Sequence, residues 1–192
     1  SSETLNYSLC GVLANPLPKD KQNLLERQNN YHFMTFGSSS IAPTDTTYGD
    51  LTLATDAKDV SYQQHWFRGA WFDSLEVYWR DMMTLGKFKN RVYEQTGSEK
   101  GTAYQGNSEG LLAAHITLAP NESTTVRFVI SWNFPNCENT WNEDARAAAE
   151  EKHQKQTWKN YYAMQWEDSK ASAIYALDHW NRLYKETKLF KD

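Results

Sequence analysis

The sequence predicts a mainly β fold, an antiparallel β-sandwich with one short inserted helix, followed by C-terminal α-helices. Short apolar runs with a period of two fall between residues 48 and 135, as is typical of strands. The period changes to a helical one near residue 73. From Asn142 onward the chain is rich in strong helix formers. We therefore expect a sandwich over residues 1–141 and a helical linker over residues 142–192.

The first 47 residues are mixed and rich in turn formers. The segment Asn15–Asp20 holds two prolines, which remove backbone donors and favour a loop. The apolar, β-prone segment Tyr31–Phe36 runs into Gly37 and three serines, so it predicts a strand that ends in a loop.

The next elements are two strands and the inserted helix. Leu51 and Leu53 alternate with polar or small residues, as do the four residues Val60, Tyr62, Gln64 and Trp66. Asp73 and Glu76 have the spacing of a capping box. Helical spacing then joins the four residues Leu75, Tyr78, Trp79 and Met82, and Gly86 is placed to end the helix.

The most regular pattern lies between residues 111 and 134. Two strands are predicted there, Leu111–Leu118 and Thr125–Phe134, with a hairpin loop at residues 119–123. The second strand places five apolar residues on one face, which we expect to be buried: Val126, Phe128, Ile130, Trp132 and Phe134.

The C-terminal tail has the pattern of a long helix, without proline or glycine over residues 166–188. Two apolar stripes run along it, one through Ala173, Leu177, Trp180 and Tyr184 and one through Ala176, Leu183 and Phe190. One sandwich covers only one side of such a helix. The second stripe therefore predicts a further partner domain that is missing from this sequence.

Composition narrows the possible partners. The formal net charge is -4 and the pI about 5.7, which argues against nucleic acid as a partner. No apolar run approaches the roughly 20 residues that span a bilayer, so no transmembrane segment is expected. The first residues lack a signal-peptide pattern. The sequence therefore does not determine the cellular compartment, although it slightly favours the cytoplasm.

No motif for catalysis, metal binding or cofactor binding is present. The phosphate loop, the HExxH motif and the nucleophile elbow are all lacking, so we expect no catalytic residue, no metal and no cofactor in this chain. Three carboxylates, Asp50, Asp56 and Asp59, fit turn and solvent roles better than calcium or sugar binding. Cys10 and Cys137 allow either one disulfide or two free thiols.

Aromatic residues are frequent, with 8 Trp, 11 Tyr and 8 Phe. Such residues fill cores and domain interfaces, and this is the favoured interpretation. They also stack on the apolar faces of sugars. Under that interpretation the candidate substrate-binding residues are Trp66, Trp71 and Trp141.

Four segments occur in an order that resembles glycoside hydrolase family 116: Tyr48–Thr55, Trp66–Asp73, Phe128–Pro135 and Asn160–Ala163. This family includes the non-lysosomal glucosylceramidases, also called bile-acid β-glucosidases, and bacterial β-glucosidases. The resemblance runs from Tyr48 to the end, whereas the first 47 residues carry little that is specific. Asn133 stands where family proteins often have aspartate.

The resemblance implies an N-terminal β-sandwich, here over residues 48–135, joined to a C-terminal (α/α) barrel by a helix at residues 158–190. It also implies a retaining mechanism with a glutamate nucleophile and an aspartate acid/base, both in the barrel. This chain is thus expected to be the non-catalytic sandwich and linker of a β-glucosidase or glucosylceramidase-like hydrolase. Its partner would be the barrel, through which a β-glucoside or glycolipid is bound. The alternative is a stand-alone carbohydrate-binding or structural interaction module.

Overall fold

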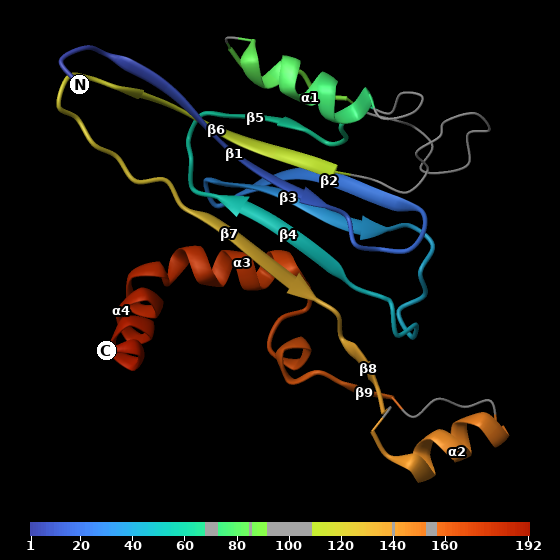
Figure 1. Cartoon of the computed structure of the whole chain (residues 1–192). Coiled ribbons are helices and arrows are strands. Elements are labelled where there is room, and N and C mark those ends of the chain that lie inside the picture. Colours follow the sequence, from blue (N-terminus) through green and yellow to red (C-terminus); the bar gives the residue numbers. More distant parts are fainter. Residues whose placement is uncertain (68–72, 85, 92–108, 140, 153–156) are drawn as a thin grey trace.

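The computed structural model of the chain describes residues 1–67, 73–84, 86–91, 109–139, 141–152 and 157–192. Within these ranges the chain forms two layers of antiparallel strands with helices outside them (Figure 1). The strands are β1 (Leu5–Ala14), β2 (Lys21–Gln28), β3 (Tyr31–Ser38), β4 (Asp50–Thr55), β5 (Val60–Gln63), β6 (Glu109–Leu118), β7 (Phe128–Asn133), β8 (Asn136–Glu138) and β9 (Thr157–Lys159). The helices are α1 (Asp73–Met83), α2 (Glu143–Lys152), the 3-10 helix η1 (Tyr161–Met164), α3 (Ser169–Asp178) and α4 (Trp180–Lys191).

Two sheets face each other across the main core. The first has the strand order β1-β6-β5 and the second the order β2-β3-β4-β7, while β8 and β9 form a separate small ribbon. Met34, Phe36 and Leu53 of the second sheet pack against Leu112 of the first, and all four are buried. The prediction of an antiparallel β-sandwich is confirmed.

Helices cover the outer face of each sheet. Tyr78 of α1 packs on Leu111 and Ala113 of β6, so the inserted helix is confirmed. Its predicted apolar stripe is only partly covered, since Leu75, Trp79 and Met82 are exposed. On the other side, Ala173 and Leu177 of α3 pack on the second sheet. Strand β4 is therefore covered on both faces, and even Thr52 and Thr55 are buried.

The predicted hairpin between residues 111–118 and 125–134 is wrong. Strand β6 has β1 on one edge and β5 on the other, so neither edge is left for β7. Strand β7 instead crosses to the second sheet and pairs with β4, with Leu51 opposite Trp132 and Leu53 opposite Ile130. Consecutive strands thus belong to different layers, which the apolar pattern of each strand does not reveal.

The expected burial of the apolar face along residues 126–134 is wrong: Val126, Phe128 and Phe134 are only partly buried, and the other two residues are exposed. Ile130 and Trp132 are 53% and 58% exposed. The cause is the width of the first sheet, which ends at β1. Gly11 of β1 lies so close to β4 that a Cβ there would stand 2.8 Å from Leu53 Cδ2, and its next neighbour is Phe128. Beyond Phe128, no described strand covers the inner face of β7.

The first 47 residues are more ordered than their turn-rich composition indicates. They hold three strands, β1, β2 and β3, and the predicted Asn15–Asp20 loop does connect the first two. Asn29 and Asn30 both have positive φ, 52° and 66°, and they form the tight turn between β2 and β3. Asparagine tolerates this conformation, so the pair is a turn signal.

The tail is not one continuous helix. Residues 158–168 hold the end of β9, the 3-10 helix and a turn. The side chains of Asn160 and Tyr162 fix this segment beside the end of β7 by donating to the Phe134 carbonyl. The helix from Ser169 is then interrupted at His179, whose φ and ψ are -107° and 16°. Cys10 and Cys137 are both free thiols.

Candidate functional site: the α3 anchor, α4 and the edge of β7

Helix α3 is anchored to the sandwich by a buried polar contact at its first residue. Ser169 is fully buried and donates from its backbone nitrogen to Asp50 Oδ2 at 3.1 Å and from its hydroxyl at 2.6 Å. A hydroxyl has one proton, so Ser169 Oγ accepts from Thr52 Oγ1, 2.6 Å away. Burial raises the pKa of the Asp50 carboxyl, and the hydrogen bonds from Ser169 act against this increase.

The rest of α3 is held by both apolar and polar contacts. Phe33 and Ala54 of the sheet meet Ala173 and Leu177 in one buried cluster. Asp168 caps the first turn by accepting from Ala171 N at 2.6 Å. Further along, three pairs tie the helix and its end to the strands: Lys170 with Glu26, Tyr31 with Asp178, and Arg127 over the Trp180 ring.

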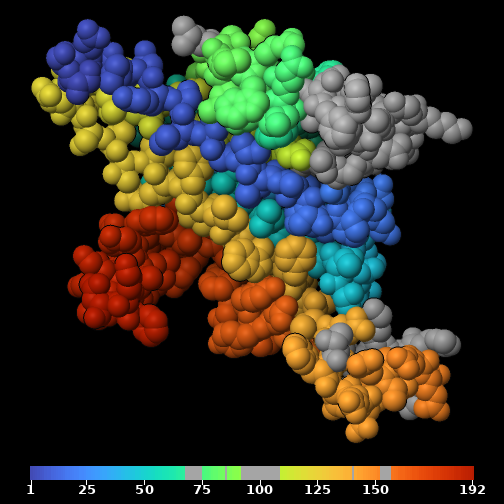
Figure 2. All heavy atoms as spheres, viewed as in Figure 1, coloured from blue at the N-terminus to red at the C-terminus, as the bar shows by residue number. Residues whose placement is uncertain are grey.

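Helix α4 leaves the sandwich after His179. It contains no buried residue, and Leu189 and Phe190 are 78% and 95% exposed. The red atoms of the C-terminal helices stand out from the strands in Figure 2. The two predicted apolar stripes therefore have different environments. Ala173 and Leu177 of the first stripe pack against the sheet, whereas Leu189 and Phe190 near the end of α4 are exposed among the described residues.

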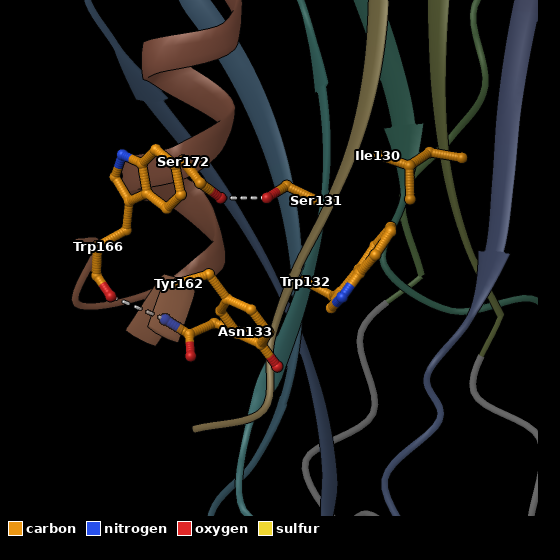
Figure 3. A pocket seen from close by; sticks show the side chains of 7 residues that line it. All are labelled: Ile130, Ser131, Trp132, Asn133, Tyr162, Trp166 and Ser172. Carbon is orange, nitrogen blue, oxygen red and sulfur yellow. Dashed lines mark hydrogen bonds between the residues drawn. The ribbon is translucent and has the colours of Figure 1, made fainter. Parts of the chain in front are cut away.

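A hollow of about 240 Å³ lies along the free edge of β7. It is lined by four successive residues of the strand and by three residues of the C-terminal segment: Ile130, Ser131, Trp132, Asn133, Tyr162, Trp166 and Ser172. Figure 3 shows Ile130 and Trp132 on one side of the strand and Ser131 on the other, bonded to Ser172.

Asn133 is the most deeply buried polar group in this hollow. The residue is only 2% exposed, and its Nδ2 donates to the Trp166 carbonyl at 3.0 Å. Its Oδ1 has no hydrogen-bond partner among the described residues. A buried carbonyl oxygen without a donor costs free energy, so Asn133 Oδ1 is an unsatisfied acceptor beside the hollow.

Of the three tryptophans proposed from sequence, the structure describes Trp66 and Trp141, and it does not bring these two together. Trp66 stacks on Tyr78 with ring centroids 4.4 Å apart, and it packs between α1 and the first sheet. Trp141 is 92% exposed and lies two residues before the start of α2, which is at the opposite end of the molecule from α1 (Figure 1). Trp71 lies outside the described residues. The aromatic residues that do share a hollow are Trp132 and Trp166. The alternation along residues 126–134 predicts a core position for Trp132, so the sequence does not indicate this hollow.

The three carboxylates weighed above have structural roles. Asp50 anchors α3, Asp56 pairs with Arg127 at 2.9 Å, and Asp59 pairs with Lys87. Among the described residues, no group of three or more His, Cys, Asp or Glu side chains is placed to hold a metal ion. A search of the same residues found no helix with the length and apolarity needed to cross a membrane.

These features define a β-sandwich domain that carries appended helices. A family model described as beta-glucosidase 2, glycosyl-hydrolase family 116 N-term, matches residues 1–183. The chain therefore belongs to the N-terminal domain family of glycosyl-hydrolase family 116. The match includes the first 47 residues, so it extends further than the segments from which the resemblance was drawn. A comparison with curated proteins gave no match.

Proposed function

We propose that this chain is a non-catalytic β-sandwich, over residues 1–141, with a linker over residues 142–192, and that it supports the catalytic (α/α) barrel of a retaining β-glucosidase. Membership of the family 116 N-terminal domain supports a partner catalytic domain. The observation that carries the supporting role is the contrast between α3 and α4. The first is fixed to the sheet, and the second presents Leu189 and Phe190 to a partner.

A supporting role requires that α4 be held in a fixed position relative to the sandwich. Asp50, Ser169 and the Phe33 cluster fix the direction in which α3 leaves the sheet, so α4 starts from a defined position. Exposed apolar side chains on a projecting helix are typical of a surface that a second domain covers. We propose that the barrel holds the catalytic carboxylates and binds the β-glucoside or glucosylceramide-like substrate.

A two-part experiment tests this proposal. The chain alone, mixed with an aryl β-glucoside, should give no turnover above buffer, while a family 116 β-glucosidase serves as the positive control. In the second part, a separately produced family 116 catalytic domain is titrated with the chain by calorimetry. The double variant Leu189→Ser, Phe190→Ser should lose binding, and the control Lys185→Ser, Lys188→Ser should keep it.

Two results would contradict the proposal. Clear glucoside turnover by the isolated chain would show that it has its own catalytic residues. Equal binding by the two double variants would show that α4 does not contact the barrel. The alternative of a carbohydrate-binding module lacks a supporting observation, because Trp66 and Trp141 lie apart and Trp66 is used in packing.

A further inference from the structure

The free edge of β7 has backbone groups that point away from its sheet. In an antiparallel pair, successive residues direct their N–H and C=O alternately toward and away from the partner strand. Arg127 O accepts from Asp56 N in the β4 direction. The same alternation turns Val129 and Ser131 toward β4, so Ile130 and Trp132 present their backbone groups at the free edge.

This edge is closed at one end and open at the other. At Phe134, which has the same orientation as Trp132, the Tyr162 hydroxyl accepts from the backbone nitrogen at 3.3 Å and donates to the carbonyl at 2.7 Å. Tyr162 thus occupies the position of a neighbouring strand. The hollow begins beside it and follows the edge past Trp132 to Ile130 (Figure 3).

The open stretch lacks the features that protect edge strands. Natural edges carry lysine, proline or an inward-pointing charge, which prevents pairing with another strand. Residues 128–133 are Phe-Val-Ile-Ser-Trp-Asn and contain none of these. In addition, Ile130 and Trp132 are more than half exposed on the inner side, and the orphaned Asn133 Oδ1 lies on the helix side.

We propose that β7 accepts one further strand from a separate polypeptide, which adds antiparallel to the second sheet. The groups along the edge of β7 set the chemistry of the added strand. Residues opposite Ile130 and Trp132 are apolar, and their backbone N–H groups face β7. The residue between them is small and polar, because its side chain lies on the same side of the sheet as Ser131 and Asn133. Backbone complementarity provides affinity and the alternating side chains provide selectivity.

A sugar fits the hollow less well than a strand does. Sugar sites place aromatic rings so that they face one bound ring, but Trp132 and Trp166 lie on opposite sides of β7 (Figure 3). A groove lined by four successive residues of an unpaired edge matches an extended backbone instead. This inference does not rest on the proposed hydrolase partnership, and its test needs no catalytic activity.

The test uses two synthetic peptides that alternate valine and threonine between lysine ends. One is N-methylated at the valines and the other at the threonines, so the two share composition and charge. The threonine-methylated peptide should bind the chain with a Kd below about 1 mM by calorimetry. The valine-methylated peptide should bind about tenfold or more weakly, because its lost N–H groups are those that face β7.

A pair of protein variants locates the binding site. Trp132→Thr should weaken binding by about tenfold or more, while Trp158→Thr, a change at a similarly exposed residue of β9, should leave it unchanged. Sedimentation of the free chain shows whether a second copy occupies the edge. Equal affinity for the two peptides, no saturable binding by the folded chain, or a dimer that Trp132→Thr dissociates would each overturn the proposal.

Discussion

Replacing Phe33 by alanine tests whether the sheet–α3 interface is a main source of stability. Phe33 is completely buried on β3, and it packs against Ala54, Ala173 and Leu177. Two of these neighbours are alanines, whose side chains cannot move into the space that the substitution leaves. We expect a cost near the range measured for buried Phe→Ala changes, about 3–5 kcal/mol.

The size of this effect is easily measured. For a chain of this length, about 1 kcal/mol lowers Tm by roughly 2–4 °C, so Phe33→Ala should lower it by roughly 6–20 °C. Urea unfolding followed by tryptophan fluorescence and circular dichroism gives the free energy directly. Phe190→Ala is the matched control, because the same atoms are removed from a side chain that is 95% exposed.

The control should change the free energy of unfolding by no more than about 0.5 kcal/mol. The reasoning is refuted if Phe33→Ala costs less than about 1 kcal/mol, or if Phe190→Ala costs as much as Phe33→Ala. Either result would mean that α3 is not held by the cluster that its side chains form with the sheet.

Three more predictions concern backbone packing and pH. Gly49→Ala should destabilise the fold by about 1–3 kcal/mol, because the new Cβ would stand 2.4 Å from the Asn133 carbonyl oxygen, whereas Gly37→Ala has open space and serves as the control in urea unfolding. Burial raises the pKa of Asp50 above its ordinary 3.8, so wild type should lose stability relative to Asp50→Asn as pH rises from about 4 to 7; a constant difference between the two urea midpoints would contradict this. Burial lowers the pKa of His115 below 6.5, so wild type should lose stability relative to His115→Gln as pH falls from about 7 to 5. Thermal melts test this, and a Tm difference between the two proteins that does not change with pH would contradict it.

The sequence predicted the central strands and the inserted helix because their apolar periods are local. It could not predict which strands pair. Strand β6 is apolar on both faces because the second sheet covers one face and α1 covers the other, and nothing in its pattern distinguishes β1 from β7 as a neighbour. The long helix was predicted without its interruption at His179, since this residue is compatible with a helix and no proline or glycine marks the break.

The candidate site was less predictable for a related reason. Trp132 has the alternation of a core residue, and its exposure depends on where the opposite sheet ends. Asp50 looked like a surface or turn carboxylate, although it anchors Ser169 across 119 positions of sequence. Both roles arise from contacts between distant segments, and a single sequence carries no signal for them.

The pairing of β1 with β6 has a consequence for the order in which the chain folds. Leu5 pairs with Leu118, so β1 has no partner until about a hundred further residues have been made. At a synthesis rate of roughly 5–20 residues per second, the delay between the synthesis of β1 and that of its partner β6 is several seconds or more. Contacts so distant in sequence also slow refolding of the whole chain. The last strand to complete each sheet, β6 in one and β7 in the other, therefore sets the time at which the sandwich can close.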